Sequence, residues 1–204
     1  MTVSTSRAKR RQSPEETRSQ ILDAAQALLR ERSFRELNVE AVMTRTGHTR
    51  TVFYRHFDDI SSLVLTLITE VGSELVEIGQ KWADHTDRAS PAQARERLGL
   101  LVGFYARNGA LVRAVVEASY HDDAVEQAYT QMVEGFVAVT SQAIQARIGR
   151  GEVAPVDAPE IARALVGMLV AYLVNAFGQE PATDPERALE TVWTIWTRTL
   201  FPGA

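Results

Sequence analysis

Cysteine is absent from the sequence, and so are long apolar runs and a secretory leader. Without cysteine there are no disulfide bonds and no thiolate zinc sites, which fits a reducing cytoplasm. The apolar stretches around residues 64–68 and 165–174 are interrupted or too short, since crossing a bilayer takes roughly 18 to 20 apolar residues. The N-terminal residues are charged and hydrophilic, without the apolar centre of a secretory signal. We therefore expect a cytoplasmic protein with no membrane segment.

Patterns typical of enzymes and metal sites are absent too. The sequence has no glycine-rich phosphate loop and no Gly-x-Ser-x-Gly turn. Its histidines stand apart, without the His-x3-His or His-Glu-x2-His spacing of a metal site. His121 is followed directly by Asp122 and Asp123, and here a capped helix start is a simpler interpretation than a metal site. We expect neither an enzyme nor a bound metal or cofactor.

The charge is unevenly distributed along the chain. The net charge is −4, but residues 1–57 hold eleven basic and six acidic residues, a net charge of +5. The remaining residues hold eleven basic and twenty acidic residues, a net charge of −9. A positive N-terminal part joined to a negative remainder favours a protein that binds nucleic acid through its first part. The alternative is a chance fluctuation of charge on a solvated surface.

Three helices are predicted near the N-terminus, the first ending near Arg32 and the other two short. Ser13, followed by proline and two acids, is typical of a helix start. Asn38 suits the cap of a second helix, which Gly47 ends because glycine readily adopts the left-handed conformation. Thr49 then caps a third helix. Two such helices of about eight residues, joined by a turn that contains glycine, form a helix-turn-helix. The predicted buried side of the third helix consists of Val52, Phe53 and Phe57.

The remainder of the chain has helical periodicity and no alternating pattern typical of a strand. A long helix is predicted from Asp59 to about residue 82, and Ser90-Pro91 starts another that Asn108-Gly109 interrupts. The fold class is all-α: a three-helix head with a helix-turn-helix, followed by a roughly six-helix body. The predicted divisions are a disordered basic arm over 1–13, a head over 14–58 and a body over 59–204.

The third helix carries side chains suited to reading DNA. A major groove admits one α-helix, and residues in its first turns contact base edges. Arg50 has the forked guanidinium that matches guanine, and threonine hydroxyls can bond phosphates or bases. The start of the first helix favours a phosphate through its backbone amides. Any basic pair of amphipathic helices would share part of this pattern. The predicted DNA contacts are Thr17, Arg18, Asn38, Arg45, Thr49, Arg50, Thr51, Tyr54, Arg55 and His56.

Residues 21–63 resemble the N-terminal domain of TetR-family repressors. The resemblance rests on Asn38-Val39-Glu40, on Gly47, and on Arg50 followed by the run Phe53-Tyr54-Arg55-His56-Phe57. It implies a repressor that binds double-stranded operator DNA as a homodimer through its last two long helices and responds to a small effector. The sequence departs from the family where Asp58-Asp59-Ile60 replaces a segment that commonly supplies a phosphate-binding lysine. His48 also replaces a small aliphatic residue in the turn.

The body resembles, more loosely, the subgroup of mycobacterial regulators of ethionamide activation. Residues 64–67, 177–181 and 194–197 carry this likeness. We expect an apolar cavity for a small, neutral, hydrophobic effector, because the polar pocket asparagines of that subgroup are apolar here, near Val166 and Leu169. For each aromatic residue, plain core packing is the alternative. The predicted lining residues are Leu101, Phe104, Tyr105, Tyr129, Val133, Phe136, Leu169, Leu173 and Trp196.

The apolar stripes of the last two long helices predict a dimer interface, with Gly167 and Ala171 allowing close helix approach. The alternative is that both helices are wholly internal to one chain. A second alternative concerns function: the missing phosphate-contact lysine would also suit a helical interaction protein that no longer binds DNA.

Overall fold

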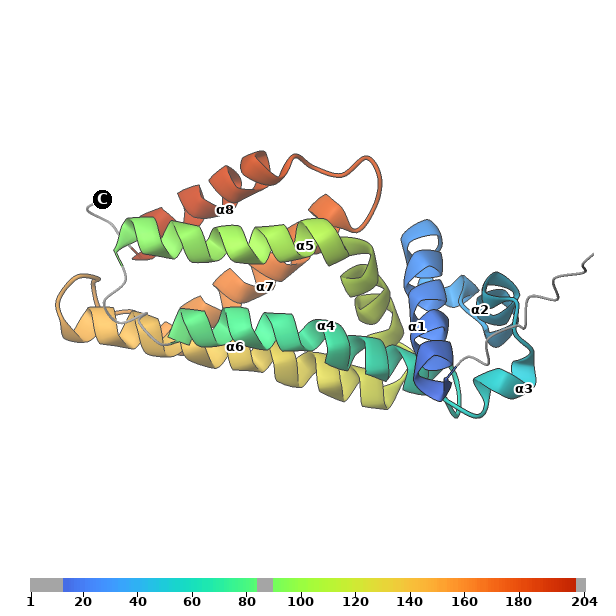
Figure 1. Ribbon diagram of the computed structural model, residues 1–204. Helices are drawn as coiled ribbons and strands as arrows, with labels where there is room; N and C mark the ends of the chain where they lie inside the picture. Colours follow the sequence, from blue (N-terminus) through green and yellow to red (C-terminus); the bar gives the residue numbers. More distant parts are fainter. Residues whose placement is uncertain (1–12, 84–89, 201–204) are drawn as a thin grey trace, which may run out of the picture.

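The computed structural model describes residues 13–83 and 90–200, and all regular elements among these residues are helices. A head of α1, α2 and α3 lies at one end of an elongated bundle formed by α4 to α8 (Figure 1). The predicted basic arm lies outside the described residues, except for Ser13. The helices are α1 (Pro14–Glu31), the short 3-10 helix η1 (Phe34–Glu36), α2 (Val39–Thr46), α3 (Arg50–Phe53), α4 (Ile60–Ala83), α5 (Pro91–Ser119), α6 (Asp123–Gly149), α7 (Ala158–Phe177) and α8 (Pro185–Leu200).

The starts of α1 and α2 follow the caps expected from the sequence, whereas Thr49 occupies the predicted cap position of α3 without a capping hydrogen bond from its side chain. The Ser13 hydroxyl accepts a hydrogen bond from the backbone N–H of Glu16 at 3.1 Å, while the Glu16 carboxylate accepts one from the Ser13 N–H at 3.0 Å. This reciprocal capping box satisfies two backbone donors that a helix start leaves unpaired. Asn38 caps α2 in a simpler way, with its side-chain oxygen accepting from Ala41 N–H at 2.9 Å. Local chemistry therefore fixes where these helices begin.

The predicted break at Asn108-Gly109 is wrong, because α5 is one continuous helix from Pro91 to Ser119. Gly109 is buried, and a Cβ on it would lie 2.3 Å from the carbonyl oxygen of Phe177 at the end of α7. The glycine is therefore required for close helix contact and not for ending a helix. Figure 1 shows that α5 nevertheless bends, and the part beyond the bend lies beside the head.

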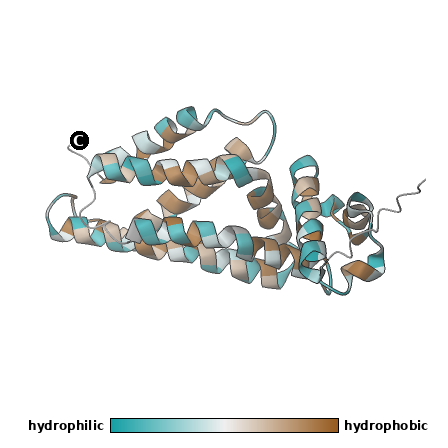
Figure 2. Cartoon of the chain, viewed as in Figure 1, coloured by the Kyte–Doolittle hydropathy of each residue, from teal (hydrophilic) through white to brown (hydrophobic). Residues whose placement is uncertain are grey.

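Two apolar cores hold the molecule together. The body core fills the space between α4, α5, α6, α7 and α8, and it includes the fully buried Phe104 and Leu173. Figure 2 shows the hydrophobic residues of these helices turned largely toward one another. The second core belongs to the head, but it also takes residues from the first half of α4, from the bent end of α5 and from the start of α6. These contributing residues are Leu63, Val64, Leu67, Leu111, Ala114, Val115, Ala118 and Val125.

Helix α7 is unusually apolar. By length and composition alone it is the one helix among the described residues that could cross a membrane, a property it shares with core helices of soluble proteins. Its inner side, including Leu165, Leu169 and Leu173, packs into the body core. Its outer side exposes small residues, among them Gly167 and Ala171. An apolar helix with one side packed and one side lined by small residues is typical of an interface between helices.

Candidate DNA-binding surface and ligand cavity

Helix α3 is shorter than the sequence indicates. Its α-helical part covers only Arg50–Phe53, and the chain continues as a tight turn in which the N–H of His56 donates to the carbonyl of Phe53 at 2.9 Å. Gly47 precedes it with φ of 71°, the left-handed conformation predicted for this turn. Two aromatic anchors fix this short element in the head, because Phe53 and Phe57 are 0% and 5% exposed and their ring centroids lie 5.6 Å apart.

The polar side of α3 faces outward. Thr49, Arg50, Thr51 and Arg55 are exposed, and Tyr54 keeps 54% of its surface accessible. Thr49 precedes the helix without using its hydroxyl as a cap. Within the part of the chain that the structure describes, the side chains of these four exposed residues make no hydrogen bond or ion pair. Because Phe53 and Phe57 anchor α3 in the head, its polar side chains form a row on the head surface, free of hydrogen bonds and ion pairs with the described residues.

Other predicted DNA contacts are already engaged inside the chain. Arg18 donates to the Thr66 hydroxyl at 3.2 Å, lies 3.6 Å from the Glu70 carboxylate and covers the Phe57 ring at 5.1 Å from its centroid. Thr17 is buried and donates its hydroxyl to the Ser13 carbonyl at 3.1 Å. The Arg18 contacts join α1 to α4, while the Thr17 bond lies within the start of α1. The prediction that Thr17 and Arg18 contact DNA stays a prediction, and both have structural roles that it did not include.

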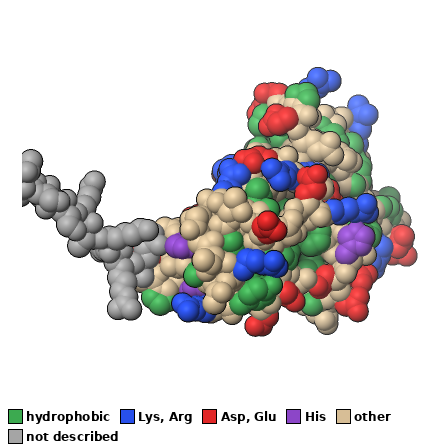
Figure 3. All heavy atoms as spheres, turned by 90° about the vertical axis from the view of Figure 1, so that its right-hand side faces the viewer, with side chains coloured by type: hydrophobic (Ala, Val, Ile, Leu, Met, Phe, Trp, Pro, Cys, Tyr) green, Lys and Arg blue, Asp and Glu red, His purple; other side chains and the backbone are tan. Residues whose placement is uncertain are grey.

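On the helix-turn-helix, Arg45 and His48 are also partnered. Arg45 forms a two-pronged ion pair with Glu31, at 2.8 and 2.7 Å. His48, which departs from the family pattern, lies 3.1 Å from the side-chain oxygen of Gln20 and so connects the turn to α1. His56 is half-buried, and its charge is one of the smaller influences that lower the pKa of Glu15; the largest is a backbone hydrogen bond. Viewed end-on, the head shows basic side chains interspersed with acidic ones (Figure 3).

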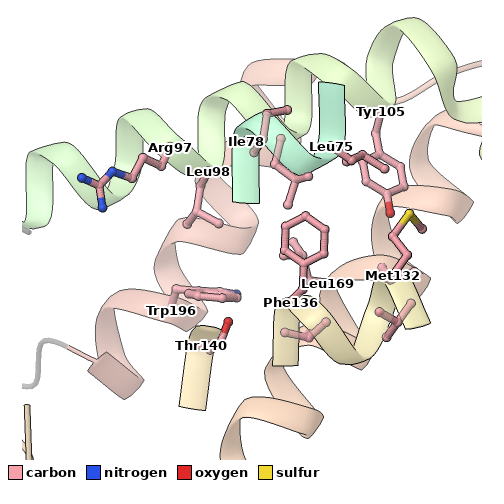
Figure 4. A pocket seen from close by; sticks show the side chains of 14 residues that line it. Leu75, Ile78, Arg97, Leu98, Tyr105, Met132, Phe136, Thr140, Leu169 and Trp196 are labelled. Carbon is pink, nitrogen blue, oxygen red and sulfur yellow. The ribbon is translucent and has the colours of Figure 1, made fainter. Parts of the chain in front are cut away.

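The body contains an apolar cavity of about 40 Å³. Figure 4 shows Phe136 reaching into it between Leu75 and Leu169, while the Thr140 hydroxyl points toward Trp196. Burial raises the pKa of the Tyr105 hydroxyl well above its usual range, so Tyr105 enters the wall as a neutral group. A neutral and largely apolar wall disfavours an ionised ligand.

Six of the nine predicted lining residues meet at this cavity: Leu101, Tyr105, Val133, Phe136, Leu169 and Trp196. The structure does not bring the other three to it. Phe104 and Leu173 are fully buried in the body core, and Tyr129 packs against the head core. For these three residues, plain packing is the better interpretation.

Several lining residues of the cavity were not predicted from the sequence. Met132 and Thr140 lie four positions before and after Phe136 on α6, so helical spacing from one recognised residue would have found them. Arg97 has no such signal; it lines the cavity while its guanidinium points away from Phe136 (Figure 4). The other missed residues are Leu75, Ile78, Leu98, Val166 and Val170.

The junction between the head and the body is held by a hydrogen bond from α5 to the head and by two contacts within the body beside it. The Glu117 carboxylate on α5 accepts a hydrogen bond from the backbone N–H of Phe34 at 2.9 Å. Arg113, one turn earlier, pairs with Glu117 at 3.1 Å. Asp122, the cap of α6, bonds the hydroxyl of Ser61 near the start of α4, and this bond is the main cause of its lowered pKa. The head is therefore held by the helices that surround the cavity.

A helix-turn-helix head on a long connecting helix, joined to a helical body with an internal apolar cavity, defines a DNA-binding regulator of transcription. Comparison with known families agrees. Residues 21–67 match the family described as bacterial regulatory proteins, tetR family, and residues 94–202 match the C-terminal domain of the transcriptional regulator EthR. The chain belongs to the TetR family of transcriptional regulators, with a C-terminal domain of the EthR type. Members of this family are regulators and not enzymes.

Individual proteins show the same likeness. The HTH-type transcriptional regulator EthR of Mycolicibacterium smegmatis is 26% identical over 94% of this chain and 89% of the relative. EthR of Mycobacterium tuberculosis is 28% identical over 89% and 85%, respectively. Among solved structures, a TetR-like regulator from Rhodococcus has a TM-score of 0.72 at 19% identity, covering 92% of this chain and 98% of that one. NalD, a repressor of a multidrug efflux pump in Pseudomonas aeruginosa, has a TM-score of 0.69 at 20% identity, covering 94% and 100%.

Proposed function

We propose that this regulator is a homodimeric repressor that binds operator DNA through α3 and releases it when a small hydrophobic effector enters the body. The observation that carries the proposal is the row of exposed, unengaged polar side chains on α3, held in place by the buried Phe53 and Phe57. This arrangement suits a major groove, which accepts a helix whose first residues project outward.

Within this surface we assign base reading to Arg50 and Thr51, with Tyr54 beside them. Thr49, Arg55 and His56 lie on the same short element and suit phosphates. Asn38 and Arg45 serve first as a cap and as the partner of Glu31, so their contribution to DNA binding is secondary. The exposed Asp58 and Asp59 add negative charge directly after α3, which weakens non-specific attraction to phosphates.

An electrophoretic mobility shift assay with DNA from upstream of the chain's own gene tests the proposal. Arg50→Ala is expected to lower specific affinity by roughly 5-fold to 150-fold, since a bidentate contact to guanine contributes about 1–3 kcal/mol. Arg45→Ala removes the same charge from a paired arginine, so it is the matched control and its effect should be several times smaller. Normal operator binding by Arg50→Ala would refute the assignment. No shift by the folded wild-type dimer at low salt would refute the repressor.

For the dimer, we propose that the outer sides of α7 and α8 pair with the same surface of a second copy. Gly167 and Ala171 are exposed on α7, and Ile195 on α8 keeps 38% of its surface accessible. Small residues allow close helix approach, and a two-fold axis brings identical surfaces together. Such a dimer can place two α3 elements about 34 to 36 Å apart, the distance between successive major grooves on one side of DNA.

Effector binding acts on this spacing in the proposed mechanism. A cavity of about 40 Å³ is far below the roughly 300 to 1,000 Å³ of pockets that hold drug-sized ligands, so an effector of that size must push the surrounding helices apart. Helix α4 borders the cavity at Leu75 and Ile78 and begins directly after the head. Displacement of α4 would change the distance between the two heads. Release requires that the effector bind the displaced state more tightly than the DNA-bound state.

A further inference from the structure

A second hollow lies beside the cavity, between α4 and α6. It is a lateral groove of about 700 Å³, within the roughly 300 to 1,000 Å³ typical of ligand pockets, whereas the closed cavity is far below that range. The two hollows share part of their lining: Leu75, Met132 and Phe136 border both. These shared side chains lie between the interior of the body and a groove that is open to solvent.

Phe136 is the main part of this partition. Its half-buried ring extends from α6 toward α4, where a Cβ on Gly79 would lie 3.6 Å from the ring (Figure 4). Two more glycines line the groove, Gly72 on α4 and Gly135 on α6, and nothing lies within 4 Å of a Cβ placed on either. The groove is therefore wide where the side chains are missing, and Phe136 has open space on its outer side.

The groove has a chemical character of its own. Its apolar surface comes from Ile68, Val76 and Val139, and Val76 is 56% exposed. At its edge lie the amides of Gln80 and Gln131, which make no hydrogen bond to any described residue. The only charged residue in the lining is Glu77, which repels anions. This surface suits a molecule that is elongated and mostly apolar, with a neutral hydrogen-bonding end.

We infer that the effector site comprises the cavity and the α4–α6 groove together, that displacement of Phe136 joins them, and that the ligand is an elongated neutral molecule with its apolar end inside. The inference rests on the proposed function, and it specifies the ligand class and the access route. A ligand in this position separates α4 from α6 directly. The Ser61–Asp122 contact joins the starts of these two helices within the body, beside the junction with the head, so a ligand that separates the helices acts at that junction.

Filling the groove without touching the cavity tests the inference. The double variant Gly72→Leu with Gly135→Leu places one side chain on each wall, and leucine is a better helix former than glycine, so the fold is retained. The control is Gly149→Leu, at the far end of α6, where a Cβ also meets nothing within 4 Å. The probe is 1-decanol, titrated by calorimetry against wild type and each variant.

We expect the double variant to bind 1-decanol at least tenfold more weakly, since each methylene that leaves its buried position lowers affinity roughly fourfold. Gly149→Leu should bind within twofold of wild type. Phe136→Ala, which removes the partition, should bind at least as tightly as wild type and associate faster. Equal binding of 1-decanol by wild type and the double variant would show that the groove is not part of the ligand site, and it would leave the repressor proposal intact. If the folded wild-type protein does not bind 1-decanol, both the inferred ligand class and the proposal of a hydrophobic effector are contradicted.

Discussion

The head and the body present their chemistry in opposite ways. On the head, polar side chains of α3 stand in solvent above aromatic anchors that are fully packed. In the body, the apolar residues expected to meet a ligand surround a cavity of about 40 Å³, far below the roughly 300 to 1,000 Å³ typical of ligand pockets. The difference indicates that the polar side chains proposed to contact DNA are already exposed, while the proposed ligand site opens fully only when Phe136 or the surrounding helices move.

Mutation of the buried residues that anchor α3 should lower the stability of the head more than mutation of its exposed residues. Phe53→Ala is expected to lower the free energy of unfolding by about 3–5 kcal/mol, because it leaves a cavity in a core where Phe53 has no exposed surface. Chemical denaturation followed by circular dichroism measures the effect. Tyr54→Ala, the neighbouring exposed aromatic, is the control, and its stability should change by less than about 0.5 kcal/mol. Similar losses for both would show that the head is loosely packed.

A charge on the outer side of α7 should break the body's proposed pairing. Ala171→Arg is expected to cost the dimer about 3–5 kcal/mol, because each copy would bury an unpaired charge. Sedimentation velocity should show a shift from dimer to monomer. Ala138→Arg makes the same change at an exposed position of α6 and should leave the dimer intact. If Ala171→Arg also remains dimeric, the interface lies elsewhere.

Gly109 tests the junction where α5 passes the end of α7. Gly109→Ala should destabilise the protein by about 1–3 kcal/mol, because its Cβ would lie 2.3 Å from the Phe177 carbonyl oxygen. Gly135→Ala, on an open helix surface, should instead stabilise it by about 0.5–1 kcal/mol through helix propensity. Thermal unfolding of the two variants gives the comparison. Stabilisation by both would mean that α5 and α7 separate at little cost.

The smallest expected effect concerns the Ser61–Asp122 contact. The pKa of Asp122 is lowered in the folded protein, mainly by the Ser61 hydroxyl, so its contribution to stability is present above the ordinary pKa of about 4. That contribution is lost as the pH falls through the lowered folded value. Ser61→Ala should therefore reduce stability slightly at pH 6 and have a smaller effect near pH 2. Urea unfolding at the two pH values measures it, and an equal loss at both would exclude the carboxylate as the cause.

Much of the head could be predicted from the sequence because its determinants are local. Ser13, Asn38 and Gly47 act on the backbone within a few residues of themselves, and the structure places each in the expected role. The exposed polar side of α3 also follows from neighbouring residues. The engagement of Arg18 with Thr66 and Glu70 could not be predicted, because it depends on how α1 crosses a helix almost fifty residues later in the chain.

The body was less predictable because its features depend on contacts between distant segments. Asn108-Gly109 resembles a helix end locally, but the buried glycine serves the approach of Phe177 from another helix. Aromatic content alone did not separate Phe136, which lines the cavity, from Phe104, which is plain core. Arg97 lines the cavity with its stem, and nothing in its sequence surroundings indicates this.

The bent end of α5 also limits how heads can be exchanged between relatives. Residues 111–118 complete the head's apolar core, and Glu117 bonds the backbone at Phe34. If only residues 14–58 were transplanted into a relative, the head core would pack against the relative's own α5 and lose the α5 residues that fit it. If the head-facing residues of α5 were transplanted together with the head, these packing contacts would be kept. The DNA specificity of this regulator is therefore portable only as a discontinuous unit, assembled from two separate stretches of the chain.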